Sequence, residues 1–302
     1  GSTNGWIPIE DDTVTDAPTK GNSEGIFGFG RYGSSPYNLS MSNLVSNSGV
    51  VSSDTTGVGT ARRGLAACEY GGDKGIFSFG SPETTNLVSN AGVIASDVTQ
   101  VGTTRYMTAA CSYGGDKGIF GFGEGPLSST NLVSNAGVVA TDTTGVGTDR
   151  ESLAACEYGD DKGIFGFGTA SGQLSITNLV SNAGVVASDQ AATTGTARNN
   201  LAACGYGYDK GIFGFGYDGG SYTGVTNLVS NAGVVASDTA AVGTARVELS
   251  ATQYGGDKGI FGFGYTGSFV ATTNLVSNAG VVASDTTGVG TARYKLAGCS
   301  FN

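Results

Sequence analysis

Short apolar runs separated by polar turns recur along almost the whole chain. One six-residue run, Gly-Ile-Phe-Gly-Phe-Gly, marks the repeat most clearly. Its copies begin at Gly25, Gly75, Gly118, Gly163, Gly211 and Gly259, with Ser78 in place of one glycine in the second copy. A period of 43 to 50 residues, built from such short runs, is typical of propeller and solenoid architectures.

Each repeat predicts four β-strands. In the second repeat, the runs 65–70 and 75–80 flank the turn Gly-Gly-Asp-Lys, and the runs 85–90 and 93–97 flank Ala-Gly. Both arrangements predict β-hairpins. No part of the period has the 3.6-residue spacing of a helix. We therefore expect an all-β fold, a six-bladed β-propeller with four antiparallel strands in each blade.

Alternation within the motif predicts how blades pack. We expect Phe27 and Phe29 to share one face of their strand, with Ile26 and the glycines on the other face. The phenylalanines of one blade would then press against the glycine face of its neighbour. Burying each Phe contributes about 1.5 to 3 kcal/mol, which exceeds the roughly 0.5 to 1 kcal/mol lost for each glycine in a strand.

The two ends of the chain predict how the blades close. The last repeat leaves a lone first strand, 296–301, whereas the first repeat begins at its second strand, 25–30. We expect these two segments to pair, so that one composite blade closes the ring and removes open sheet edges. Residues 25–302 would then form a single domain. Residues 1–24, which include Trp6 and an acidic cluster, are expected to form an arm or linker.

Composition narrows the functional classes. The net charge of −10 and pI of about 4.4 argue against nucleic acid as a partner, because phosphate binding needs clustered basic residues. The absence of histidine excludes Ser-His-Asp and Cys-His catalysis and histidine-ligated metals. Aspartates about 45 residues apart do not make a calcium loop. We expect no enzymatic activity, cofactor or metal.

The cysteines predict a structural role and a reducing site of synthesis. Five of the six repeats carry a cysteine at the same position, and the sixth has Thr252 there; the cysteines are Cys68, Cys111, Cys156, Cys204 and Cys299. Equivalent positions in neighbouring repeats are expected to be too far apart for disulfides. An odd number of thiols fits synthesis in a reducing cytoplasm. No apolar run reaches the length of a membrane span, so we expect no membrane insertion.

The order of residues in each repeat resembles the kelch-type blade. The second strand ends in Phe-Gly, as at Phe215-Gly216, a variable loop and two strands follow, and an arginine closes the repeat. The resemblance covers about residues 25–302 and implies a β-propeller. The stretch from Thr273 to Arg293 is also similar to near-identical repeats in environmental bacterial viruses and microbial proteins of unassigned role. That similarity implies a viral or microbial origin. Our functional hypothesis adds display on a virus particle.

Charged residues that recur in every repeat are expected to be structural. They are the closing arginines Arg62, Arg105, Arg150, Arg198, Arg246 and Arg293, and the fourth-strand aspartates Asp54, Asp97, Asp142, Asp189, Asp238 and Asp285. We expect each arginine to be held by a nearby aspartate and by backbone carbonyls, which fixes the crossover between blades. The alternative is a ring of arginines that binds an anion at the channel mouth.

Function is expected where the repeats differ. Two windows vary in length and chemistry, one after the Phe-Gly strand and one after the closing arginine. In an antiparallel four-stranded blade, both leave at the same end. The candidate ligand-binding residues in these windows are Arg31, Tyr32, Tyr37, Arg63, Tyr106, Glu151, Asn199, Asn200, Tyr217, Asp218, Tyr222, Glu248, Tyr265, Phe269, Tyr294 and Lys295. Variable loops rich in Tyr, Ser, Gly and Asn on a rigid scaffold suit adaptable binding.

These patterns favour a monomeric, non-enzymatic binding module that recognises a cell-surface glycan or protein. The alternative is a structural or assembly domain of a virus particle or repeat array, in which the variable loops contact other subunits.

Overall fold

The computed structural model describes residues 22–302, apart from 34–36, 126, 192 and 194. These residues form eighteen strands in six separate three-stranded antiparallel sheets and contain no helix. The strands of the first three sheets, in spatial order, are β18 (Ala297–Phe301), β1 (Glu24–Gly28) and β2 (Ser42–Val45); β3 (Ala66–Tyr70), β4 (Lys74–Ser78) and β5 (Asn86–Val88); and β6 (Ala109–Tyr113), β7 (Lys117–Gly123) and β8 (Leu127–Val133). Those of the other three are β9 (Ala154–Tyr158), β10 (Lys162–Gly166) and β11 (Thr177–Val180); β12 (Ala202–Tyr206), β13 (Lys210–Tyr217) and β14 (Tyr222–Val229); and β15 (Ser250–Tyr254), β16 (Lys258–Tyr265) and β17 (Phe269–Val276).

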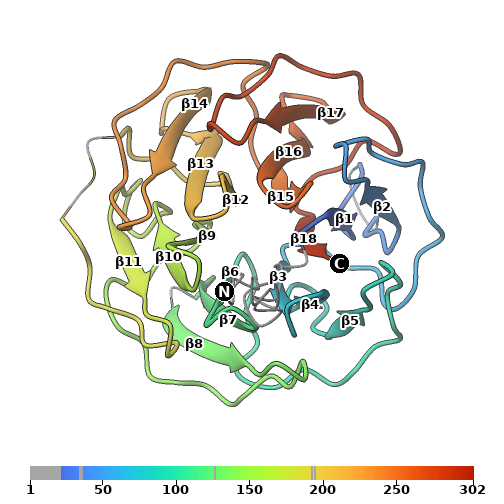
Figure 1. Cartoon of the computed structure of the whole chain (residues 1–302), viewed down its shortest axis with the longest axis horizontal. Coiled ribbons are helices and arrows are strands. Elements are labelled where there is room, and N and C mark those ends of the chain that lie inside the picture. The colour runs from blue at the N-terminus through green and yellow to red at the C-terminus, as the bar shows by residue number, and fades with distance from the viewer. Residues whose placement is uncertain (1–21, 34–36, 126, 192, 194) are drawn as a thin grey trace, which may run out of the picture.

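The sheets are arranged side by side around a common centre, which gives a propeller-like repeat architecture (Figure 1). The first strand of each sheet contacts the first strand of the next, and β18 contacts both β15 and β3. The expected pairing of the chain ends is confirmed, because β1 and β18 are antiparallel partners with Ile26 opposite Cys299. The first repeat therefore obtains its missing strand from the last residues of the chain.

The expectation of four strands in each sheet is wrong. The segment predicted as the fourth strand makes only isolated bridges in the second sheet, Val88 to Ile94 and Thr85 to Val98. Between these bridges the side chain of Asn86 donates from Nδ2 to the carbonyl of Ala95 at 2.9 Å. A side chain thus takes the place of a backbone donor, which interrupts the ladder.

No strand ladder joins one sheet to the next, so the paired strands do not themselves form a continuous closed ring. Single backbone hydrogen bonds make these connections instead. On the face of the variable windows, an N–H of each sheet donates to a carbonyl of its neighbour: Gly64 to Lys295, Met107 to Gly64, Ser152 to Met107, Asn200 to Ser152, Glu248 to Asn200 and Lys295 to Glu248. The series returns to the residue at which it started.

A second series lies on the opposite face, at the hairpin turns. Its bonds run from Gly71 to Asp116, Gly114 to Asp161, Gly159 to Asp209, Gly207 to Asp257, Gly255 to Ser23 and Asn302 to Asp73. The last two bonds involve the chain ends and follow the same pattern as the internal ones. Asn22 is only 1% exposed and Glu24 begins β1, so residues 22–24, which we assigned to the arm, belong to the folded part. Residues 1–21, including Trp6, lie outside the described residues.

The two phenylalanines of each motif do not share a face, contrary to expectation. Phe27 packs with Phe263 of the sheet on one side, whereas Ile26 and Phe29 pack with Phe77 of the sheet on the other. The cause is the backbone, because the second phenylalanine of every copy has a φ between 62° and 65°. This left-handed conformation ends the strand alternation and turns Phe29 to the opposite side.

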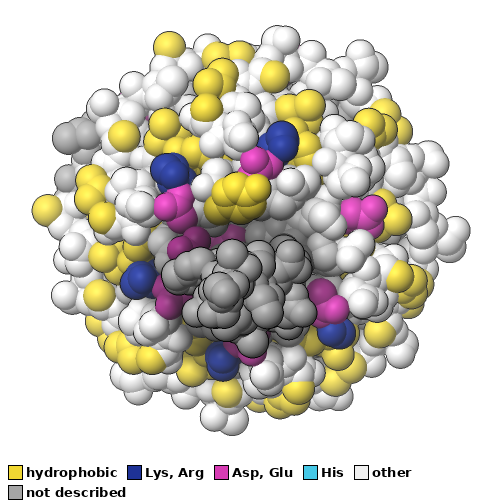
Figure 2. Space-filling view, in the orientation of Figure 1, with side chains coloured by type: hydrophobic (Ala, Val, Ile, Leu, Met, Phe, Trp, Pro, Cys, Tyr) yellow, Lys and Arg dark blue, Asp and Glu magenta, His cyan; other side chains and the backbone are white. Residues whose placement is uncertain are grey.

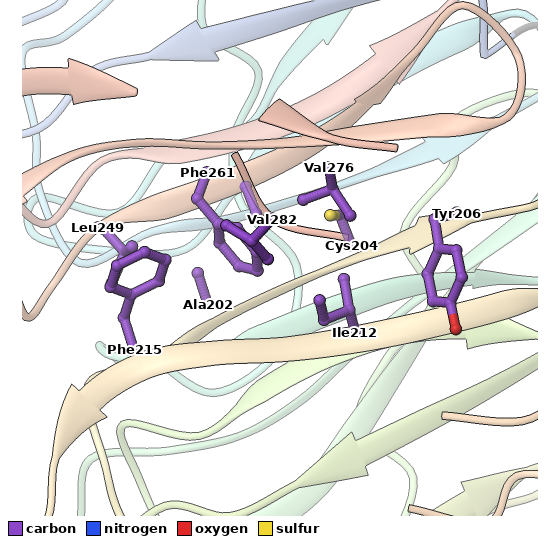
Figure 3. Packing of buried hydrophobic residues seen from close by; sticks show 10 residues of the cluster. Ala202, Cys204, Tyr206, Ile212, Phe215, Leu249, Phe261, Val276 and Val282 are labelled. Carbon is purple, nitrogen blue, oxygen red and sulfur yellow. The ribbon is translucent and has the colours of Figure 1, made fainter. Parts of the chain in front are cut away.

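The expected contact between phenylalanine and glycine is present. A Cβ added to Gly214 would lie 2.8 Å from the ring of Phe261 in the next sheet, so the glycine leaves room for that ring; in the second sheet the equivalent position holds the small residue Ser78. Figure 3 shows this cluster, in which Phe215 and Phe261 lie between two sheets together with Leu249. The ring centroids of Phe215 and Phe261 are 5.2 Å apart in an edge-on arrangement. The hydrophobic core therefore consists of layers between adjacent sheets.

Candidate functional site

Both variable windows lie on one face and pair with each other. The residue after each Phe-Gly donates its backbone N–H to a carbonyl of the second window, as Arg31 does to Tyr294 at 2.8 Å. Tyr217 and Tyr265 make the same bond to Asn199 and Val247, at 2.9 Å each. The backbone therefore holds these side chains at equivalent positions in successive sheets.

An open cavity of about 760 Å³ lies on this face. It spans three neighbouring sheets, those built around β13, β16 and β1. Its lining is Arg31, Gly33, Asn200, Tyr217, Tyr222, Val247, Glu248, Tyr265, Phe269 and Tyr294. All of these residues belong to the variable windows, and all except Gly33 and Val247 are candidates from the sequence.

Aromatic rings form a continuous wall of this cavity. The Tyr222 ring lies between those of Tyr217 and Tyr265, with centroids 6.1 Å and 6.3 Å away. Phe269 continues the wall, 5.5 Å from Tyr265 and stacked at 5.2 Å on Tyr294. These contacts restrict the rings, so a ligand would meet a surface that is already in place.

A partly buried ion pair lies beside the cavity, whose lining includes Glu248. Lys295 Nζ is 3.3 Å from Glu248 Oε1. Burial raises the pKa of Glu248, and the charges of Lys295 and Arg31 partly offset that effect. Lys295 also lies over the ring of Tyr106, 5.0 Å from its centroid, and the Arg63 guanidinium is 5.7 Å from the same ring. These three candidates form a neighbouring cluster outside the cavity lining.

The remaining candidates are not part of the cavity lining. Tyr32 contacts Phe269 with centroids 5.4 Å apart, and Tyr37 is 53% exposed. Asp218 accepts backbone hydrogen bonds from Gly220 and Ser221, which closes its own loop. Asn199 is buried and takes part through its backbone. Glu151 lies elsewhere on the face, where burial and the charge of Glu124 raise its pKa.

The six closing arginines are at most 2% exposed, and their contacts are those expected of structural residues. Arg198 shows the pattern that Arg150 and Arg246 share: its Nε donates to the carbonyl of Phe215 at 2.8 Å and its Nη2 to Asn227 Oδ1 at 2.6 Å. Its guanidinium lies 4.3 Å from the ring centroid of Phe167 in the preceding sheet. Its Nη1 is 4.0 Å from Asp238. Burial lowers the pKa of each closing arginine to about 10, and the facing aspartate opposes this. Such burial contradicts the alternative of an anion-binding ring.

The opposite face carries the Asp-Lys turns. Figure 2 shows acidic side chains around the centre of one face, with basic side chains beside them. In the turns each lysine pairs with the aspartate that precedes it, as Lys162 does with Asp161 at 2.9 Å. Among the described residues, no group of three or more His, Cys, Asp or Glu side chains could hold a metal ion.

Sequence reasoning missed a polar cluster in the central channel. The residue that follows each cysteine, or Thr252 in the repeat without one, varies among the repeats. This position places Glu69, Glu157 and Gln253 in the lining of a cavity of about 60 Å³. Gln253 Nε2 donates to Glu157 Oε1 at 2.9 Å, and the amide group of Asn22 lies beside both side chains. The sequence contains a signal for this cluster, because the position differs among the six repeats, with Glu, Ser, Glu, Gly, Gln and Ser.

No protein-family model matches the chain, and no curated protein sequence matches it. In the part of the chain that the structure describes, no helix is long and apolar enough to cross a membrane.

Proposed function

We propose that the chain is a non-enzymatic binding module that recognises a carbohydrate through the aromatic cavity of the variable face. The observation that supports this most is the wall of Tyr217, Tyr222, Tyr265, Phe269 and Tyr294. Pyranose rings have an apolar C–H face and a polar rim, and tyrosine offers a flat apolar ring with a hydroxyl at its edge. An open cavity lined by aromatic rings and a few polar groups suits such a ligand.

We further propose that the scaffold is a closed six-bladed propeller of kelch-like type. Both series of hydrogen bonds between sheets include a bond across the junction of the chain ends, and β18 contacts β15 as well as β3. Closure matters for binding, because the cavity spans the junction between the first and last repeats. Arg31 lies on one side of this junction and Tyr265 on the other.

A triple variant tests the proposed site. Tyr217→Ala, Tyr222→Ala and Tyr265→Ala together remove three of the rings, so glycan binding on a broad array should be lost. The melting temperature should remain within a few degrees, because these side chains belong to the surface windows. Tyr37→Ala is the matched control, since Tyr37 lies in a variable window but does not line the cavity. Glycan binding retained by the folded triple variant contradicts the assignment of this cavity.

Assembly is the second candidate function. Six valines at the same position of the repeat are 63–65% exposed: Val50, Val93, Val138, Val185, Val234 and Val281. Such a periodic set of exposed apolar side chains suits contact with other subunits. Light scattering after size-exclusion chromatography separates the two functions. A stable oligomer that is dispersed by Val→Ser substitutions, together with no hit on a glycan array, favours assembly.

A further inference from the structure

The variable face has different chemistry on its two sides, which narrows the class of ligand. The first residue after Phe-Gly has the same backbone hydrogen bond in all six sheets, so its side chain can be compared directly among them. In chain order these residues are Arg31, Ser81, Glu124, Thr169, Tyr217 and Tyr265. The cavity lies where Tyr217, Tyr265 and Arg31 follow one another around the centre. The other three positions carry two small hydroxyl side chains and an acid.

Arg31 is the basic side chain in the cavity lining; its charge acts on Glu248 without forming an ion pair with it. Two ionisable groups of opposite sign line it, Arg31 and Glu248, and Glu248 is paired with Lys295 at 3.3 Å. Within the described residues, the guanidinium of Arg31 has no hydrogen-bond or ion-pair partner. By contrast, Arg63 donates to Asn38 Oδ1 at 3.0 Å and is held against the scaffold. Arg31 is therefore available to a ligand in the cavity.

An arginine beside an aromatic wall matches a sugar that bears a carboxylate. The planar guanidinium can bind both oxygens of a carboxylate through two parallel hydrogen bonds, while the C–H face of the same sugar lies against Tyr265 or Tyr217. The net charge of −10 does not attract anions, so selectivity for an acidic sugar has to come from this local group. The acids Glu124 and Glu151, whose charges interact, are on other sheets of the face and do not line the cavity.

We infer that the ligand is an acidic carbohydrate, of the uronic-acid or sialic-acid class, with its carboxylate bound by Arg31. This inference rests on the proposed function and names the substrate class of the same cavity. The backbone of Arg31 is held by Tyr294, since each donates an N–H to the carbonyl of the other at 2.8 Å and 3.0 Å. That anchor does not depend on the side chain, so the guanidinium can be replaced without loss of the fold.

The test compares acidic oligosaccharides with the same compounds after reduction of their carboxylates to alcohols. The wild-type protein should bind the acidic member of each pair about 10 to 100 times more tightly, the range typical of a charge-assisted contact. Arg31→Gln should remove this preference, so that the acidic and the reduced member of each pair bind with equal affinity. Lys74→Gln is the matched control, because it changes the net charge equally but lies at the start of β4, beside a hairpin turn of the opposite face, and it should keep the preference.

The possible failures can be told apart. Equal affinity of the wild-type protein for acidic and reduced members, with binding lost in Tyr265→Ala, overturns the acidic ligand but supports a glycan site. An acid preference that survives in Arg31→Gln overturns the role of Arg31. If the folded protein binds neither member of any pair on a broad array, both this inference and the proposed function fail.

Discussion

Thr291 donates two hydrogen bonds to Asp54 Oδ2, from its backbone N–H at 2.9 Å and its hydroxyl at 2.7 Å, although the two residues are 237 positions apart. The same pair occurs between every two successive sheets, as in Thr60 with Asp97, where the distances are 2.9 Å and 2.6 Å. The contact at the junction of the chain ends therefore has the same geometry as the contacts inside the chain. This equivalence is what a closed propeller requires.

The first prediction compares this contact at the junction and inside the chain. In each aspartate, one carboxylate oxygen accepts two hydrogen bonds, and Asp54→Asn and Asp97→Asn disrupt these bonds. Each substitution should therefore lower the free energy of unfolding by about 1 to 2 kcal/mol. Chemical denaturation measures both. If Asp97→Asn is destabilising while Asp54→Asn costs nothing, the sheets do not form the proposed closed propeller in solution.

The second prediction concerns the strand that completes the first sheet. Deletion of residues 296–302 removes β18 and with it the buried side chains of Leu296 and Phe301. Loss of these two alone costs about 3 to 6 kcal/mol, and β1 is left with an unpaired edge. The melting temperature should fall sharply. Val50→Ala, at a side chain that is 64% exposed, should leave it unchanged. An unchanged melting curve for the deletion contradicts the account.

The third prediction is loss of stability in acid. Burial alone would raise the pKa of Asp54, but hydrogen bonds from Thr291 and Asn43 and the charge of Arg293 outweigh it and hold the pKa below 3.8. The five equivalent aspartates are shifted in the same direction. A lowered folded-state pKa gives stability that is present above the unfolded value near 4 and lost as the pH falls through the folded value. Glu248 acts in the opposite sense, because burial raises its pKa.

Thermal unfolding measured between pH 7 and pH 2.5 checks this. The melting temperature should change little down to about pH 5 and then fall steeply below about pH 4. A melting temperature that is constant, or that rises, between pH 5 and pH 3 contradicts the stabilising role of the aspartates.

The fourth prediction concerns thiol reactivity. All five cysteines are buried and free, and burial raises the pKa of each thiol, to about 12 for Cys204. Because the thiolate is the reactive species, a disulfide exchange reagent should label none of them in the native protein at pH 8. All five should react after unfolding in guanidinium chloride. Rapid labelling of the native protein contradicts the tight packing between sheets.

Much of the fold could be predicted from the sequence, because its main signals are local and repeated. The period indicated six equivalent units. Because the first repeat lacks its first strand, the lone last strand of the chain, Ala297–Phe301, could be predicted as the missing one. The prediction from strand alternation was wrong at Phe29, because a φ of 62° is unusual for phenylalanine and no pattern of apolar residues indicates it. The prediction of a fourth strand was wrong for a related reason, because the side chain of Asn86 competes with the backbone for the carbonyl of Ala95.

The arrangement of the variable face could be predicted only in part. Differences among the repeats identified the windows, and strand order placed them on one side of the molecule. Which of their residues come together depends on packing between neighbouring sheets, such as the stacking of Phe269 on Tyr294. The sequence alone therefore could not separate Tyr265, which lines the cavity, from Tyr37, which does not. Nor could it show that Asn22 contacts the polar side chains of the channel, since that contact joins distant segments.

The stoichiometry of binding tests the central claim most directly. If recognition depends on the variable face, the near-identical repeats supply the scaffold and the cavity around Tyr265 supplies the site. Titration calorimetry with a glycan that scores on the array should therefore give one ligand per chain, and no measurable heat with the triple tyrosine variant. Six equivalent ligands per chain, or the same heat with that variant, would place binding on the repeated framework and contradict the account.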